Sequence, residues 1–163
     1  MSIHDTLLEV HSKPDWDGHI NEAGLAIIKS FEGWRSSCYH CGARWTIGWG
    51  STYDLDGNRI TADQPDIDEV EGEALLRQEV QNSEGAIRRI VKAPLNENQF
   101  SALCSFIYNV GSGNFYRSTM RQKISRLDYE GAADEFPKWK KSAGRTLPGL
   151  VRRRVAERDL FMG

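Results

Sequence analysis

Residues 31–52, FEGWRSSCYHCGARWTIGWGST, decide the fold of this chain. Before this stretch, apolar residues recur at the spacing of one helix face and end with Phe31. Asn21 is a suitable N-cap residue, and Gly33 is suited to ending a helix because it tolerates a left-handed backbone. The pattern therefore predicts a helix over residues 22–32.

The second half of the stretch has the two-residue period of a β-strand. Trp45, Ile47 and Trp49 alternate with threonine and glycine. The pair Asp56-Gly57 is typical of a tight turn and precedes the short run 59–61. We therefore expect a small β-hairpin or meander after the first helix.

The rest of the chain has the period of amphipathic helices. Asp66 and Glu69 have the spacing of a capping box and predict the start of one long helix that ends before Pro94. Asn96 and Gln99 predict the start of the next helix, and shorter helical patterns follow it. The predicted fold class is α+β, with one helix, a small antiparallel sheet and a larger, mostly helical lobe.

Length and composition indicate one globular domain. The chain has 163 residues, 39% of them hydrophobic, and a net charge of -2. We expect a polar extension over residues 1–19 and a domain over residues 20–163. The near-neutral charge argues against nucleic acid as a partner, and the short apolar runs argue against membrane insertion. Because no secretory signal is apparent, we expect the protein to accumulate in the cytoplasm. We also expect it to be a monomer.

Three cysteines, Cys38, Cys41 and Cys104, cannot all pair within one chain and favour a reducing compartment. Cys38 and Cys41 have a Cys-x-x-Cys spacing, but no second Cys/His pair completes a zinc site. A thioredoxin-like pair would precede a helix, whereas this pair precedes a hairpin. Reversible oxidation of the pair remains a separate hypothesis, and Cys104 lies on an apolar helix stripe as a core residue.

Glu32 is the first candidate for catalysis. It follows Ile28 by four residues and stands at the C-terminal end of its predicted helix. The negative end of the helix dipole and partial burial both favour the protonated form of a carboxyl group. A general acid requires this form, although a glutamate in a last turn is also a common surface residue.

The residues around Glu32 make the stretch specific. Phe31-Glu-Gly, Thr46-Ile-Gly-Trp-Gly50, the run 106–115 and Leu147-Pro-Gly-Leu-Val-Arg-Arg-Arg154 occur in this order. The chain thereby resembles the phage-type lysozymes, the endolysin and muramidase enzymes of glycoside hydrolase family 24. The resemblance covers the chain from about residue 20 onward.

The resemblance implies a lysozyme-like fold and cleavage of bacterial peptidoglycan between N-acetylmuramic acid and N-acetylglucosamine. Glu32 matches the family's acid, and Thr46 matches the threonine that positions water or stabilises the intermediate. By spacing alone, Thr46 would be an ordinary strand residue. One basic residue among 152–154 is implied to approach the acid. Peptidoglycan is the implied partner, and no metal or organic cofactor is implied.

The chain departs from the family between Glu32 and Thr46. The family usually places an aspartate nine residues after the acid and six before the threonine, but this loop is one residue short. Counting forward reaches Cys41 and counting back reaches His40. We favour Cys41, because cysteine occurs at this position in phage members of the family and Tyr39 matches their tyrosine.

A cysteine at this position leaves two functions open. A thiolate can attack the anomeric carbon or assist a water molecule, and a neighbouring cation such as His40 or Arg44 would favour the thiolate. The rule that relates carboxylate separation to retention or inversion does not transfer to a thiol. The alternative is a non-catalytic peptidoglycan-binding protein that has lost the second carboxylate.

Overall fold

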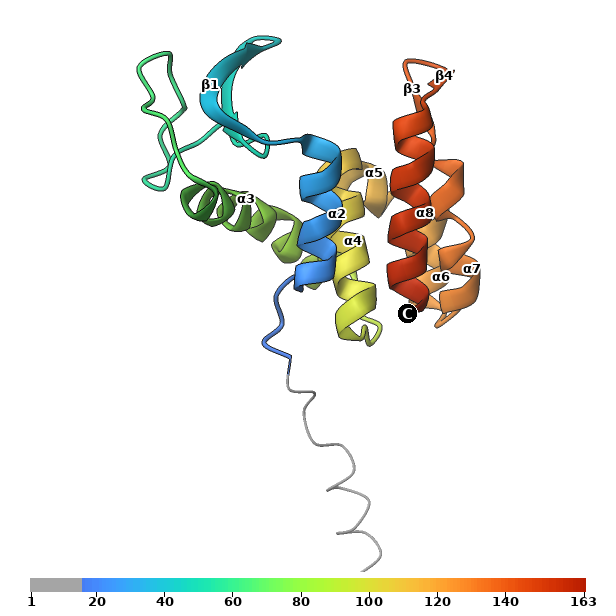
Figure 1. Ribbon diagram of the computed structural model, residues 1–163. Coiled ribbons are helices and arrows are strands. Elements are labelled where there is room, and N and C mark those ends of the chain that lie inside the picture. Colours follow the sequence, from blue (N-terminus) through green and yellow to red (C-terminus); the bar gives the residue numbers. More distant parts are fainter. Residues whose placement is uncertain (1–15) are drawn as a thin grey trace, which may run out of the picture.

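The computed structural model describes residues 16–163, so residues 1–15 of the predicted extension lie outside the described part. A small lobe contains the β1–β2 hairpin and the loop after it, and a larger lobe is mostly helical (Figure 1). The predicted α+β class, with a helix before a small antiparallel hairpin, is confirmed. Among the described residues, no helix combines the length and hydropathy needed to cross a membrane.

Helix α2 (Glu22–Glu32) has the predicted bounds, because local signals fix both of its ends. The Asn21 side chain accepts a hydrogen bond from the Gly24 backbone N–H, and Gly33 follows the helix with a φ of 74°. The apolar face buries Leu25 and Ile28 in the main core. The C-terminal end of α2 faces the hairpin (Figure 1).

Strands β1 (Arg35–Cys41) and β2 (Arg44–Gly48) form the antiparallel hairpin, with Tyr39 paired to Thr46. The turn expected at Asp56-Gly57 is present, with an isolated antiparallel bridge between Tyr53 and Arg59, but it is not the turn of the main hairpin. The strand predicted from the alternation in residues 45–48 is confirmed as β2, and it pairs with β1. The residues of β1 are mostly exposed and polar, so they show no apolar alternation.

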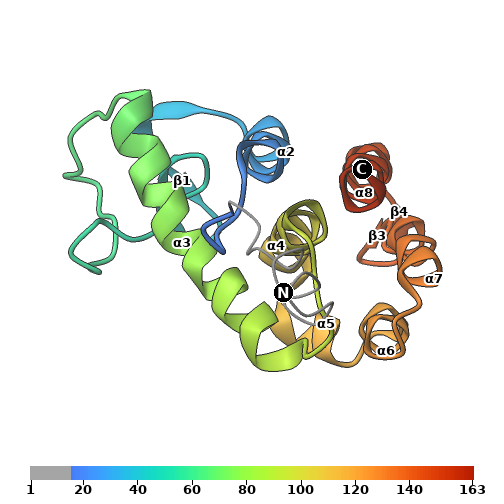
Figure 2. The same cartoon turned by 90° about the horizontal axis from the view of Figure 1, so that it is seen from below.

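Helix α3 (Glu69–Ile90) is the long helix that the sequence predicts, and it runs from below the hairpin into the helical lobe (Figures 1 and 2). Its capping box is formed by Asp68 and Glu71, so the prediction that used Asp66 and Glu69 is wrong by two residues. Both acidic pairs have the same spacing, which explains the error. The helix packs against β2 at one end and α4 farther along.

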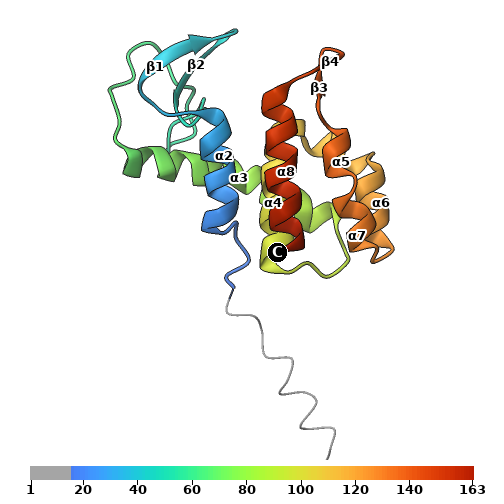
Figure 3. The same ribbon diagram turned by 45° about the vertical axis from the view of Figure 1, so that its right-hand side comes forward.

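The larger lobe is built around α4 (Glu97–Val110), whose predicted capping box of Asn96 and Gln99 is confirmed. Figure 3 shows α4 and α8 (Pro148–Met162) side by side, with the shorter helices on the side away from the hairpin. The remaining elements are α5 (Ser112–Tyr116), α6 (Thr119–Ser125), α7 (Tyr129–Ala133), η1 (Phe136–Lys138), β3 (Lys141–Ser142), β4 (Arg145–Thr146) and α8 (Pro148–Met162). Edge-to-face aromatic contacts of Phe106 with Phe115 and Phe136 fill the centre of this lobe.

The segment before α2 packs onto the helical lobe. The Trp16 ring lies edge-on to Phe100 at a centroid distance of 5.0 Å. His19 Nδ1 lies 2.7 Å from a carboxylate oxygen of Glu84, which is buried in α3. The last residues of the predicted extension, 16–19, therefore contact the domain.

Candidate active site

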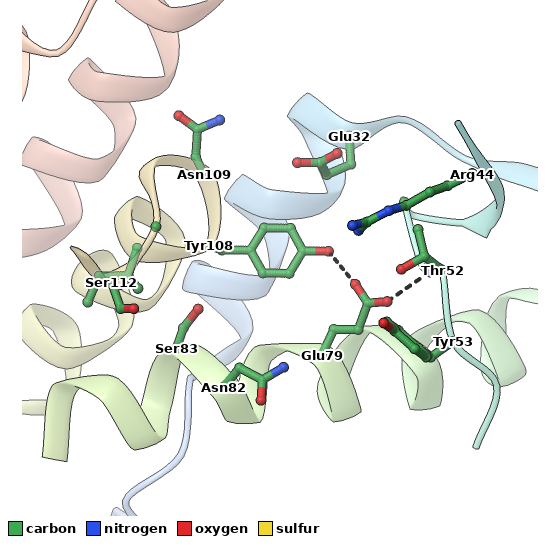
Figure 4. Close-up of a pocket in the computed structure, with 13 residues that line it drawn as sticks. Glu32, Arg44, Thr52, Tyr53, Glu79, Asn82, Ser83, Tyr108, Asn109 and Ser112 are labelled. Carbon is green, nitrogen blue, oxygen red and sulfur yellow. Dashed lines mark hydrogen bonds between the residues drawn. The ribbon is translucent and has the colours of Figure 1, made fainter. Parts of the chain in front are cut away.

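A groove of about 520 Å³ lies between the loop after β2, helix α3 and the ends of α2 and α4. Figure 4 shows its side chains converging from both lobes. Most of the lining is polar and suited to hydrogen bonds with a sugar chain, and it includes Glu32, Arg44, Thr52, Tyr53, Glu79, Asn82, Ser83, Tyr108, Asn109 and Ser112. Among residues 16–163, no group of three or more histidine, cysteine or acidic side chains is arranged to hold a metal ion.

Glu32 lies in this groove as the last residue of α2. Its side chain is 29% exposed, so it is shielded from bulk water but still accessible. Arg153 Nη1 lies 3.4 Å from Glu32 Oε1. Arg153 is therefore the member of the basic run that approaches the acid, which the sequence could not single out.

A buried carboxylate orients this arginine. Glu157 Oε1 accepts hydrogen bonds from Arg153 Nε at 3.1 Å and from Ser105 Oγ at 2.7 Å. The other oxygen of Glu157 accepts a hydrogen bond from Arg154, whose guanidinium also donates to the Asn109 side chain. Glu157 thus holds two arginines, one directed to Glu32 and one to Asn109 in the groove.

Cys41 and Thr46 lie on the hairpin beside the groove and are not among the residues that line it. Cys41 is the exposed last residue of β1, opposite Arg44, and Thr46 is 4% exposed within β2. Tyr39 is the strand partner of Thr46. The pKa of Tyr39 is raised, mainly by burial. Cys41 and Glu32 also raise this pKa, whereas the positive charge of Arg35 lowers it.

The other two cysteines have different surroundings. Cys38 packs against the small apolar cluster that contains Ile47, Ile60 and Leu75. Cys104 is fully buried in α4, as expected for a core residue, and burial raises the pKa of its thiol. All three thiols are free.

Glu79 and Tyr108 face each other in the groove and were not among the predicted site residues (Figure 4). Tyr108 Oη donates to Glu79 Oε2 at 3.2 Å, and the Thr52 backbone N–H donates to Glu79 Oε1 at 2.8 Å. Burial is the largest cause that raises the pKa of Glu79, and these hydrogen bonds only partly oppose it. No local pattern could reveal this pair, because its members are 29 residues apart.

Comparison with known proteins identifies the family. The profile described as Phage lysozyme matches residues 29–157. The endolysin of Acyrthosiphon pisum secondary endosymbiont phage 1 is 42% identical over 149 residues, 88% of this chain and 97% of the relative. The endolysin of Salmonella phage P22 is 39% identical over 144 residues, with 88% and 97% of the two chains covered. A crystal structure of a P22 lysozyme mutant matches with a TM-score of 0.81 and 35% identity, covering 89% of this chain and 99% of the other. The chain belongs to the phage lysozyme family.

Proposed function

We propose that this endolysin hydrolyses the β-1,4 bonds between N-acetylmuramic acid and N-acetylglucosamine of peptidoglycan with Glu32 as its general acid. The observation that carries the proposal is the partly buried Glu32 carboxyl in a polar groove, with Arg153 beside it. The protonated carboxyl donates its proton to the glycosidic oxygen as the bond to the anomeric carbon breaks. Arg153 fixes the direction in which the carboxyl points.

Cys41 supplies the electron pair on the opposite side of the sugar. As a thiolate, it either attacks the anomeric carbon and forms a thioglycosyl intermediate, or accepts a proton from an attacking water molecule. In the first route, water then releases the sugar while ionised Glu32 accepts its proton. Arg44 is the strand partner of Cys41 across the hairpin.

Thr46 supports the same step from β2. Its hydroxyl positions the attacking water or stabilises the intermediate. Because side chains supply both proton transfer and displacement, we propose that the enzyme needs no cofactor. We also propose that it acts as a monomer and does not bind nucleic acid. The protein acts on the wall after it leaves the host cytoplasm through a membrane lesion, without stable insertion into the membrane.

A non-catalytic peptidoglycan-binding protein is the second candidate. The observation that favours it is the cysteine in place of an aspartate between Glu32 and Thr46. The endolysin relatives, matched over nearly their whole length, favour the enzyme. The two candidates differ in whether bonds in the wall are broken.

Loss of turbidity of permeabilised Gram-negative cells separates the candidates. We expect lysis by the native protein, loss of lysis in Glu32→Gln and Cys41→Ala, and lysis by Cys41→Asp, which restores a carboxylate. Cys38→Ala is the matched control and should lyse cells like the native protein. Lysis that persists in Glu32→Gln contradicts the mechanism, and absence of lysis by every form favours the binder.

The mass of the released muropeptides tests the reaction type. Hydrolysis adds one water molecule to each cleaved bond, whereas transglycosylation leaves an anhydro sugar. We expect the hydrolytic mass. Anhydro products would show that the muramic acid hydroxyl, rather than water, completes the reaction.

A further inference from the structure

Glu79 connects two walls of the groove. One carboxylate oxygen accepts the backbone N–H of Thr52 from the small lobe, and the other accepts the hydroxyl of Tyr108 from α4. Figure 4 shows the Glu79 carboxylate between these two partners and below Glu32. Glu79 therefore fixes a loop on one side of the groove and a phenol on the other.

The hydrogen bond to Glu79 fixes the direction in which the Tyr108 hydroxyl donates its hydrogen. Burial raises the pKa of Tyr108 first, and the charges of Glu79 and Glu32 raise it further, so the phenol keeps its proton. A phenol has one hydrogen to donate, and that hydrogen is directed to Glu79. The oxygen therefore presents only lone pairs to the groove that Tyr108 lines.

The charged groups around this pair come from several elements. Arg44 of β2 directs its guanidinium into the same space, and Glu32 of α2 lies above the pair (Figure 4). Arg153 of α8 contacts Glu32. An arginine can only donate hydrogen bonds. The groove thus places a donor, Arg44, near an oriented acceptor, Tyr108.

We propose that Glu79 is a positioning residue that keeps the Tyr108 hydroxyl oriented as a hydrogen-bond acceptor for the glycan chain. Its partner is a polar hydrogen of the glycan, a sugar hydroxyl or an acetamido N–H. The identity of this ligand rests on the function proposed above. The role of Glu79 is to bind and orient the glycan, not to transfer the proton.

The substitution Glu79→Gln tests the orientation. If the glutamine oxygen keeps the Thr52 N–H, its amide group faces Tyr108 and reverses the hydroxyl, which then donates into the groove. Tyr108→Phe removes the hydroxyl altogether. Glu73→Gln is the matched control, because Glu73 lies on the same helix but binds Lys29 outside the groove lining.

Binding is measured in the Glu32→Gln background by co-sedimentation with purified Gram-negative peptidoglycan. We expect Glu79→Gln and Tyr108→Phe each to weaken binding about three- to tenfold, the loss that corresponds to one hydrogen bond. The double variant should bind no more weakly than either single variant, since both remove the same contact. Glu73→Gln should bind like its parent.

In the protein that retains Glu32, the same variants should raise KM by a similar factor and leave kcat within about twofold. Thermal denaturation of each variant shows that the fold is kept, and Tyr108→Phe provides the test if Glu79→Gln does not fold. Unchanged binding in both variants, additive losses, or a fall in kcat at constant KM would overturn the inference. Binding is measured in the Glu32→Gln background and does not depend on catalysis. If the native protein proves inactive, the proposed hydrolysis is contradicted, but the binding assay still tests the role of Glu79.

Discussion

Gly50 lies directly against the Glu32 carboxyl: a Cβ atom built on Gly50 would be 3.1 Å from Glu32 Oε2. Gly50 also has a φ of 92°, in the region that side chains rarely adopt. The backbone after β2 can therefore approach the acid closely only because this residue has no side chain.

Gly50→Ala should lower kcat at least tenfold, because the new methyl group displaces the acid from its position. Gly57→Ala is the matched control, since Gly57 has a φ of 83° but open space around its Cβ position. Both variants should lose about 1–2 kcal/mol of stability from backbone strain, and only the first should lose activity. Muramidase assays together with urea denaturation measure both effects. Equal kcat values in the two variants would contradict this account of Gly50.

A second pair of glycines predicts opposite changes in stability. A Cβ on Gly24 would be 2.8 Å from Ile20 Cγ1 and 2.9 Å from Ser101 Cβ, whereas a Cβ on Gly85 meets only the flexible Arg89 side chain at 3.4 Å. Gly85→Ala should raise the free energy of unfolding by about 0.5–1 kcal/mol. Gly24→Ala should lower it by about 1 kcal/mol or more, because overpacking exceeds the gain in helix propensity. Urea denaturation measures both values, and stabilisation by Gly24→Ala would show that α2 and α4 can separate.

Glu157→Gln should destabilise the fold by about 3–5 kcal/mol, because it removes the buried carboxylate that two buried guanidinium groups share. Asp134→Asn is the comparison. It removes the carboxylate of an exposed ion pair with Arg158, which lies on α8 like Glu157, and should cost less than about 1 kcal/mol. Chemical denaturation of the two variants gives the comparison. Similar losses would mean that Glu157 does not hold the arginines as a charged group.

Glu135 predicts a dependence of stability on pH. Burial opposes its ionisation, but hydrogen bonds from Lys123 and Lys138 outweigh burial and hold the pKa of Glu135 below its ordinary value of 4.5. Its stabilising effect is therefore complete above pH 4.5 and is lost as the pH falls through the lower folded-state pKa.

The difference in unfolding free energy between the native protein and Glu135→Gln should accordingly be larger at pH 7 than at pH 3. Glu130→Gln, an exposed neighbour on α7, serves as the control and should show a smaller change. Denaturation curves at the two pH values measure this. A difference that grows toward pH 3 would reverse the assigned sign.

The elements that could be predicted from the sequence are those with local signals at their ends. Asn21 and Gly33 define α2, and Asn96 with Gln99 defines the start of α4. The start of α3 was ambiguous, because two acidic residues two positions apart have the same relation to a following glutamate. Strand β1 has no such signal, since its pairing with β2 rather than its own pattern makes it a strand.

The residues of the candidate site likewise differ in whether a local sequence signal marks them. Glu32 was predictable because its place at a helix end and its flanking residues are adjacent in sequence. Glu79 and Tyr108 line the groove and Arg153 contacts Glu32 through the packing of α3, α4 and α8, which no single segment encodes. The catalytic roles of Glu32, Cys41 and Thr46 remain predictions; the variants described above test those of Glu32 and Cys41.

The link from Glu157 through Arg153 to Glu32 joins residues near opposite ends of the chain. During synthesis, the ribosome releases the acid and the hairpin more than a hundred residues before the cation that orients the acid. A nascent or truncated polypeptide without α8 would contain Glu32 but would lack Arg153. The acid therefore gains its neighbouring cation only after α8 has been synthesised.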